Sequence, residues 1–337
     1  MIHPIPPGTR DLLPEEMREL RELHAMLLGV FERFGYGEVR TPTLEYDEVV
    51  ARGDGRTAAA GYRLFAEEGE LLALRSDMTV PIARLAASRF AGDEGPLRFS
   101  YLAPAYRAVR PRSGQLREFE QAGVELIGVP APDGTAEVIE VLDAALKAAG
   151  LGRAVIGLGD GDVYPALLDE FEIEGERRAT VLERLERHDL VGLGEVLGGL
   201  ESLGADERRT LLELPQLRGG VEVLERARQL GGEAVARAVA RIQATFEAVD
   251  ARGAAGRVRV DLGLIRDFDY YTGAVLEVYD PALGHILGGG GRYDRLLGRF
   301  GADRPAAGFS LYVERVQLAR AATDEGPGDR GATEGSR

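Results

Sequence analysis

The stretch at residues 262–273 reads Leu-Gly-Leu-Ile-Arg-Asp-Phe-Asp-Tyr-Tyr-Thr-Gly, and a strand-like run follows at residues 274–279. Within six residues it places one guanidinium, two carboxylates and two phenols, contributed by Arg266, Asp267, Asp269, Tyr270 and Tyr271. A forked guanidinium suits a carboxylate, and a phenol suits an imidazole or an amide, so this group can hold a small zwitterion. The same pattern is typical of a solvated turn leading into a strand, so the stretch alone leaves both interpretations open.

Composition limits the possible chemistry. The chain has 337 residues, of which 45% are apolar, enough to fill a sizeable globular core. It contains no cysteine, which excludes disulfides, thiolate catalysis and cysteine zinc sites. Its four histidines show no spacing typical of metal ligands: His3, His24, His188 and His285. We therefore expect neither a metal site nor a cofactor.

The charge balance argues against nucleic acid and membrane surfaces as general partners. Basic residues number 41 against 56 acidic ones, giving a net charge of −15. Lys147 is the only lysine, so neither a Gly-Lys-Ser/Thr phosphate loop nor a plausible Schiff base is present. The first residues lack the regions of a signal peptide, and no apolar run approaches the ~18 residues of a membrane span. We expect a cytoplasmic protein.

Hydrophobic periodicity predicts an α+β fold built on an antiparallel sheet. Helices are expected at residues 14–34, 79–90, 133–150, 293–299 and 312–322. Strands are expected at residues 38–42, 62–66, 71–75, 97–109, 117–127, 154–158, 257–262, 274–279, 285–287 and 305–311, with a tight glycine turn at 288–291. Residues 97–109 and 117–127 should form an antiparallel hairpin.

Four further segments complete the predicted organisation. Residues 53–61 read as a mobile loop. Residues from 163 to about 252 are rich in Arg, Glu, Leu and Ala with glycine-containing breaks, which predicts a helical insert within a core spanning 1–322. The polar tail at 323–337 lacks apolar residues to bury, so we expect it to be disordered.

Three other stretches carry residues suited to chemistry. In Arg75-Ser-Asp-Met-Thr79, Asp77 can meet an ammonium group, or it can cap a helix. On the strand at 117–127, alternation places four residues on one face, which is either a polar site or a wet surface: Phe119, Gln121, Gly123 and Glu125. The run Gly288-Gly-Gly-Gly-Arg292 matches neither the dinucleotide fingerprint nor a P-loop.

Together and in this order, these stretches resemble the class II aminoacyl-tRNA synthetase core, and most closely histidyl-tRNA synthetase. The opening Pro-Gly-Thr-Arg-Asp-Leu-Leu-Pro at 7–14 is similar to that family's start. Residues 106–121 resemble its motif 2, residues 264–271 its histidine-recognising motif, and residues 308–315 its motif 3. The resemblance covers about residues 5–322.

The resemblance implies a histidine pocket. Asp77, Thr79 and Gln121 would meet the ammonium group of the amino acid, although Asp77 is shorter than the synthetases' glutamate. Arg266 would lie near the carboxylate. Glu125, Tyr270 and Tyr271 would lie near the imidazole, whose donor and acceptor a carboxylate and a phenol can satisfy. Arg107 completes the predicted histidine-binding set, and no residue is expected to be catalytic.

The chain departs from the synthetases where they hold ATP. Motif 2 of the synthetases reads Arg-His-Glu-Arg-Pro, and here Val109 replaces the glutamate. Gln115 replaces a second arginine, and Tyr312 replaces a small glycine of motif 3, where its ring would occupy space that adenine needs. Arg107 and Arg315 remain for the phosphates. No anticodon-binding domain follows motif 3, so we expect no tRNA binding.

This combination resembles the regulatory subunits of ATP phosphoribosyltransferase, the first enzyme of histidine biosynthesis. The resemblance implies a non-catalytic subunit that activates a short catalytic subunit in a hetero-octamer, dimerises through its own synthetase-like core, and mediates allosteric feedback by L-histidine. The alternative is an enzyme: a truncated histidyl-tRNA synthetase paralogue that adenylates histidine or a related amino acid.

Overall fold

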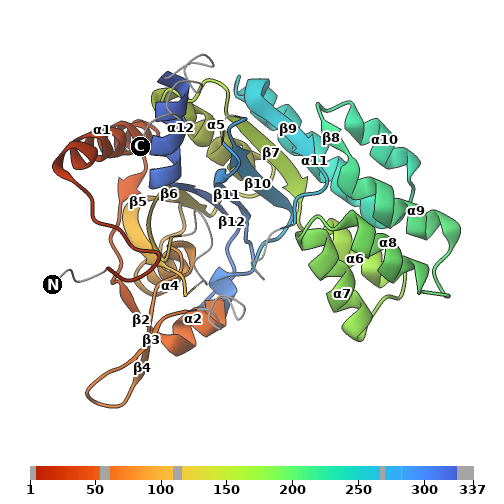
Figure 1. Ribbon diagram of the computed structural model, residues 1–337, viewed down its shortest axis with the longest axis horizontal. Helices are drawn as coiled ribbons and strands as arrows, with labels where there is room; N and C mark the ends of the chain where they lie inside the picture. Colours follow the sequence, from red (N-terminus) through yellow and green to blue (C-terminus); the bar gives the residue numbers. More distant parts are fainter. Residues whose placement is uncertain (1–4, 54–60, 109–115, 266–269, 282, 325–337) are drawn as a thin grey trace, which may run out of the picture.

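A nine-stranded sheet forms the centre of the molecule (Figure 1). The structure, a computed structural model, describes residues 5–53, 61–108, 116–265, 270–281 and 283–324. The strand order is β1-β5-β6-β12-β11-β10-β7-β9-β8. The strands are β1 (Gly37–Glu38), β5 (Leu97–Tyr106), β6 (Glu118–Ile127), β7 (Val155–Asp160), β8 (Arg218–Gly219), β9 (Val258–Asp261), β10 (Ala274–Tyr279), β11 (Ile286–Arg292) and β12 (Ala306–Tyr312).

Most neighbouring strands are antiparallel, as predicted. The exceptions are β1 with β5 and β7 with β9, which pair in parallel. The predicted hairpin of β5 and β6 pairs over ten residues on each strand, from Leu97 opposite Ile127 to Tyr106 opposite Glu118. The predicted α+β class with an antiparallel sheet is therefore confirmed.

Three helices lie together along the sheet: α1 (Pro14–Arg33), α5 (Asp133–Ala148) and α12 (Val313–Asp324) (Figure 1). Helix α1 begins with a proline and two acids in its first turn, which suit the free N–H groups and positive dipole end. Its apolar positions at helical spacing are buried, namely Leu20, Leu23, Leu27, Val30 and Phe31. Gly35 follows with a φ of +81°, a left-handed conformation that ends the helix as predicted.

A second, smaller core lies between the sheet and helix α4 (Thr79–Arg89). It combines Met78 and Ile82 with Phe99 from β5 and with two buried tyrosines, Tyr270 and Tyr293. The stretch that ends at Gly273 thus packs its first tyrosine against the start of α4, far away in sequence. This second core forms the surroundings of the candidate site.

The glycine run at residues 288–291 is part of a strand, so the predicted tight turn is wrong. All four glycines lie within β11 and are buried between β10 and β12. A Cβ on Gly288 would lie 2.2 Å from the carbonyl oxygen of Ser310, and one on Gly290 would lie 2.0 Å from that of Gly308. Close approach of β12 requires these glycines, whereas a turn would have used their conformational freedom.

The helical insert enters the chain between the parallel strands β7 and β9. Its helices are α6 (Val163–Glu170), α7 (Gly175–Glu186), α8 (Leu190–Gly198), α9 (Ala205–Glu213), α10 (Val223–Gln229) and α11 (Glu233–Ala251). Figure 1 shows α7 to α10 gathered at the end of the molecule away from α1. Helix α11 returns against α5 and β7, and strand β8 extends the main sheet next to β9. The division into domains, with the insert at about 163–252, stays a prediction.

A separate three-stranded sheet joins β2 (Leu44–Tyr46), β3 (Arg63–Phe65) and β4 (Leu71–Leu74) in the order β2-β4-β3. Neither β2 nor α2 (Asp47–Gly53) is predicted from the sequence, because both are too short for a clear period. The predicted helix at 293–299 is reduced to a single 3-10 turn, η3 (Leu297–Arg299); two further turns are η1 (Leu214–Gln216) and η2 (Ala255–Arg257). Residues 54–60 of the predicted loop and 325–337 of the predicted tail lie outside the described residues. Among the helices that the structure describes, none has the length and apolarity to cross a membrane.

Candidate functional site

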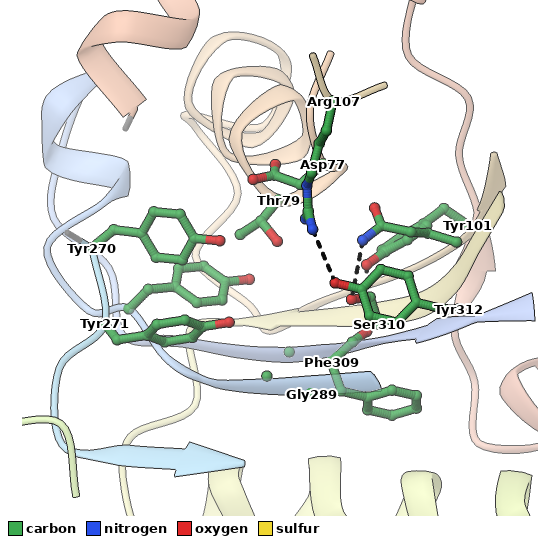
Figure 2. A pocket seen from close by; sticks show the side chains of 14 residues that line it. Asp77, Thr79, Tyr101, Arg107, Tyr270, Tyr271, Gly289, Phe309, Ser310 and Tyr312 are labelled. Carbon is green, nitrogen blue, oxygen red and sulfur yellow. Dashed lines mark hydrogen bonds between the residues drawn. The ribbon is translucent and has the colours of Figure 1, made fainter. Parts of the chain in front are cut away.

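A small pocket, which we call the cavity, lies between the start of α4 and strands β6, β11 and β12 (Figure 2). Six of the eight predicted histidine-binding residues line it: Asp77, Thr79, Arg107, Gln121, Tyr270 and Tyr271. Glu125 lies behind this lining, and Arg266 lies outside the described residues. The cavity also contains side chains that the sequence did not single out, namely Tyr101, Tyr293, Phe309 and Ser310.

Arg75 holds the segment that carries Asp77. Its guanidinium is buried and donates to three backbone carbonyl oxygens: Pro104 at 2.7 Å, Thr41 at 2.9 Å and Pro42 at 3.3 Å. These bonds fasten the junction between β4 and α4 to the neighbouring strand β5 and to the chain before β2. Arg75 therefore has a structural role, and it fixes the position from which Asp77 reaches the cavity.

Asp77 both caps a helix and faces the cavity. The sequence offers a helix cap and an ammonium partner as alternatives, and the structure allows both at once. Its Oδ1 accepts a hydrogen bond from the Val80 N–H at 3.2 Å, near the N-terminus of α4. Its Oδ2 is buried and has no hydrogen-bond partner among the described residues. Burial raises the pKa of this carboxyl group, and the Arg107 charge opposes part of that rise. A carboxylate oxygen held in this way is suited to accept from a cation.

Gln121 contributes a second free acceptor to the same cavity. Its side chain is only 2% exposed, and its Nε2 donates to Ser310 Oγ at 3.3 Å (Figure 2). Its Oε1 is buried without a hydrogen-bond partner in the described part of the chain. Buried acceptors are normally satisfied. Two unsatisfied acceptors on one cavity therefore indicate a ligand with several N–H donors, such as an ammonium group.

Glu125 forms a second layer behind Thr79. Thr79 Oγ1 donates to its Oε1 at 2.8 Å, and the Tyr293 hydroxyl donates to its Oε2. The side chain is 1% exposed, and burial raises its pKa to about 8, although the two hydrogen bonds act against that rise. A Cβ on Gly308 would lie 1.8 Å from Oε2, so the carboxylate fits only because Gly308 has no side chain. With Phe119 and Gln121 also buried, the alternative of a wet strand face is wrong.

Two adjacent aromatic side chains, Tyr270 and Tyr271, form what we call the tyrosine wall. Their ring centroids lie 4.9 Å apart, and Tyr293 meets Tyr270 edge to face at 5.9 Å. Figure 2 shows the hydroxyl groups of Tyr270 and Tyr271 directed toward the cavity. Tyr293 could not be predicted as a site residue, since its only signal in the sequence is that it directly follows the glycine run. The pairing between β11 and β12 decides its position.

The opposite end of the cavity is filled by Tyr312. Arg107 Nη1 donates to its hydroxyl at 3.2 Å (Figure 2). The Arg315 guanidinium lies 4.4 Å from the centroid of the Tyr312 ring. Phe119 meets the same ring edge to face, with 5.4 Å between the ring centroids. The Arg107 guanidinium carbon lies over the Phe119 ring, 5.0 Å from its centroid. Arg315 also donates to the carbonyl oxygen of Ile286 at 2.7 Å. Both arginines thus interact with Tyr312 inside the protein.

Metal coordination has no support in the described residues, where no group of three or more His, Asp or Glu side chains could hold an ion. The lining instead combines carboxylate, amide, hydroxyl and guanidinium groups. Such a set recognises a small polar molecule through hydrogen bonds.

Comparison with known proteins gives one consistent family. The family model for histidyl-tRNA synthetase matches residues 8–316. The ATP phosphoribosyltransferase regulatory subunit of Moorella thermoacetica is 42% identical over 321 residues, which is 95% of this chain and 82% of that protein. The subunit of the same name from Desulforamulus reducens is 38% identical over 314 residues, covering 93% of this chain and 78% of that protein.

A solved structure agrees with these relatives. The crystal structure of an ATP phosphoribosyltransferase regulatory subunit/histidyl-tRNA synthetase from Bacillus halodurans C has a TM-score of 0.86 at 36% identity. The match covers 95% of this chain and 83% of that chain. It confirms the predicted class II synthetase-like core, including the helical insert. The chain therefore belongs to the ATP phosphoribosyltransferase regulatory subunits, a family with the histidyl-tRNA synthetase fold.

Proposed function

We propose that this regulatory subunit binds L-histidine in the cavity and passes the signal to a separate catalytic subunit of ATP phosphoribosyltransferase. One observation carries the proposal: the buried acceptors Asp77 Oδ2 and Gln121 Oε1 have no partner in the described chain, whereas Tyr312 already occupies the arginines at the other end. The protein has thus kept groups for an amino acid and filled the region where a synthetase would hold a nucleotide.

Histidine matches the cavity group by group. Its ammonium would donate to Asp77 Oδ2 and Gln121 Oε1, which supply acceptors that water alone would otherwise have to satisfy. Its imidazole would lie against the tyrosine wall, with the Glu125 carboxyl behind the lining. Thr79 Oγ1, which donates to Glu125, would accept from the ammonium. Arg107 has a buried Nε without a partner among the described residues, and it can meet the carboxylate together with Arg266, the role that the synthetase resemblance implies.

The subunit would catalyse no reaction of its own. Activation of an amino acid needs ATP held in line, with cations on its phosphates. Here the Arg107 guanidinium bonds to Tyr312, and the Arg315 guanidinium covers the same ring and bonds to a backbone carbonyl. The replacements Val109 and Gln115, which lie outside the described residues, remove further nucleotide contacts of the synthetases.

The partner follows from the family. A regulatory subunit acts through a catalytic subunit, and we propose a short-form ATP phosphoribosyltransferase in a hetero-octamer, with self-dimerisation through the synthetase-like core. Histidine would reduce the activation that the assembly provides, because binding at one subunit changes the affinity or activity at another. The subunit would need no cofactor, no tRNA and no membrane.

Three measurements on the purified full chain test this function. Calorimetry should show histidine binding, and addition of the chain to its cognate catalytic subunit should raise phosphoribosyltransferase activity. Histidine should then lower that activity. Pyrophosphate exchange with ATP and histidine should remain at background; turnover above background would instead establish the truncated synthetase. An absence of both histidine binding and activation would refute the regulatory role proposed here.

A further inference from the structure

The tyrosine wall is anchored at Thr272 by residues of the main sheet. The Thr272 N–H donates to the carbonyl oxygen of Arg292 at 2.7 Å, and its Oγ1 accepts from the Asp294 N–H at 2.9 Å. Asp294 Oδ1 in turn accepts from Arg292 Nη2 at 2.6 Å and from the Ala306 N–H at 2.9 Å. This first anchor involves only β11, β12 and the chain between them.

Gly273, the next residue, is anchored to a different part of the chain. Its carbonyl oxygen accepts from the Gly161 N–H at 2.7 Å, and its own N–H donates to Asp162 Oδ2 at 3.0 Å. Gly273 has a φ of +69°, a left-handed conformation that favours glycine. The second anchor therefore holds the wall to the turn that joins β7 to the first helix of the insert.

That turn is itself held by helix α11, at the far end of the insert in sequence. Asp160 is 1% exposed, and both of its carboxylate oxygens accept from Arg241, at 2.7 Å from Nε and at 2.8 Å from Nη2. Asp160 Oδ1 also accepts from the Asp162 N–H at 3.1 Å. A buried carboxylate that loses its guanidinium keeps an uncompensated charge, so this bidentate pair fixes the turn.

The segment that carries the wall is packed tightly on one side and borders a pocket on the other. On the cavity side, a Cβ on Gly291 would lie 2.9 Å from Cδ1 of Tyr271, so the ring packs directly on the glycine strand. On the other side, a second, open pocket is lined by Asp162, Arg241, Thr272, Gly273 and Asp294. On that side the polar bonds, and not packing, therefore hold the segment in place.

We infer that Asp162 and Arg241 are positioning residues for the tyrosine wall, and that they connect the histidine cavity to helix α11 of the insert. The inference rests on the proposed function, because it assumes that histidine binds against the wall. Neither side chain touches the proposed ligand. A ligand that fixes the position of the wall therefore also fixes Gly273, Asp162 and the Asp160–Arg241 pair. By thermodynamic linkage, a disturbance at α11 weakens the binding of that ligand.

The experiment compares Arg241→Gln and Asp162→Ala with a matched control on the same helix. Arg237→Gln removes an ion pair with Glu233 one turn earlier, where both side chains are largely exposed. Calorimetry should show histidine binding about five- to tenfold weaker in both test variants, which corresponds to roughly one lost hydrogen-bonded contact. The control should bind like the wild type. Arg241→Lys keeps the positive charge but loses the bidentate guanidinium. Its histidine affinity should lie between those of Arg241→Gln and the wild type.

Hydrogen–deuterium exchange separates positioning from general damage. In the wild type and the control, histidine should slow exchange both in β6, which lines the cavity, and in α11. In Arg241→Gln and Asp162→Ala, saturating histidine should still protect β6 but no longer α11. Circular dichroism and the midpoint of thermal unfolding identify a variant that fails to fold, in which case Arg241→Lys decides.

The outcomes distinguish this inference from the function beneath it. If histidine protects neither β6 nor α11 in the wild type, the proposed ligand is wrong. If it protects β6 alone in the wild type, the connection to α11 does not exist. If the test variants keep both the affinity and the protection of α11, Asp162 and Arg241 do not position the wall, and the inference is overturned.

Discussion

The two ends of the cavity differ in whether their polar groups already have partners. At one end, Asp77 Oδ2 and Gln121 Oε1 are buried acceptors without a donor among the described residues. At the other end, Arg107 and Arg315 are engaged by the ring and hydroxyl of Tyr312. Folded proteins rarely leave buried acceptors unsatisfied, so the first end is prepared for a ligand. At the second end, Tyr312 is the partner of both arginines, and of the two guanidinium groups only the Arg107 Nε is buried without a partner in the described chain. Under the proposed function, this difference separates an amino-acid half of the site that is kept from a nucleotide half that is filled.

The largest effect should come from removing the Asp77 carboxylate at the first end of the cavity, which we call the open end. We predict that Asp77→Ala weakens histidine binding by about 2–5 kcal/mol, or about 30-fold or more, because a buried charge partner of the ammonium is lost. Calorimetry measures the change. Asp77→Asn serves as the control for the helix cap, since its amide oxygen can still accept from the Val80 N–H. Equal affinity of Asp77→Ala and the wild type would show that the ammonium lies elsewhere.

A smaller effect should follow from filling the space behind the open end. The Cβ of Gly308→Ala would meet Glu125 Oε2 at 1.8 Å and the carbonyl oxygen of Val124 at 2.5 Å. We predict a loss of about 1–3 kcal/mol in the free energy of unfolding, measured by urea denaturation, together with weaker histidine binding. Gly92→Ala is the matched control, because nothing lies within 4 Å of its Cβ. Wild-type stability of Gly308→Ala would mean that Glu125 moves freely.

The buried Glu125 also predicts how stability depends on pH. Its pKa is raised to about 8 in the folded chain, whereas an unfolded glutamate titrates near about 4.3. Between these values the folded state binds the proton and the unfolded state does not, so rising pH lowers stability, by at most about 1.4 kcal/mol per pH unit. The difference in unfolding free energy between wild type and Glu125→Gln, followed from pH 5 to pH 8, should show this slope. A difference independent of pH would place an ionised Glu125 in the folded protein.

The sequence predicts the long-period features of the fold and most of the residues that the structure brings together at the cavity. Helix α1 and the hairpin of β5 and β6 follow from spacing alone, because one buried face imposes a period on consecutive residues. Asp77, Gln121 and Tyr270 were found because polar groups in apolar surroundings need a partner. The resemblance to histidyl-tRNA synthetase implies histidine as their shared ligand, which stays a prediction.

Features decided by pairing between distant strands could not be predicted. The glycines of β11 were read as a turn, since glycine serves both turns and close strand contacts, and only the approach of β12 distinguishes the two. Tyr293 joins Glu125 across 168 positions in sequence, so no local pattern could reveal the contact. The dual use of Asp77, with one oxygen on the helix and the other on the cavity, likewise depends on where β6 places Gln121.

Removing Tyr312 from the second end of the cavity should affect histidine affinity least. Tyr312→Gly removes the ring between Arg107 and Arg315, and leaves Asp77, Gln121 and the tyrosine wall unchanged. We predict that histidine affinity changes less than about threefold, a difference below 1 kcal/mol, while weak binding of ATP becomes measurable by calorimetry. The freed guanidinium groups provide the reason, because phosphate oxygens replace the phenol as their partner. Tyr312→Phe is the control: it loses only the hydroxyl bond to Arg107 and should bind no ATP. If Tyr312→Gly loses histidine as strongly as Asp77→Ala, the two ends form one site and do not differ in the way their partners suggest.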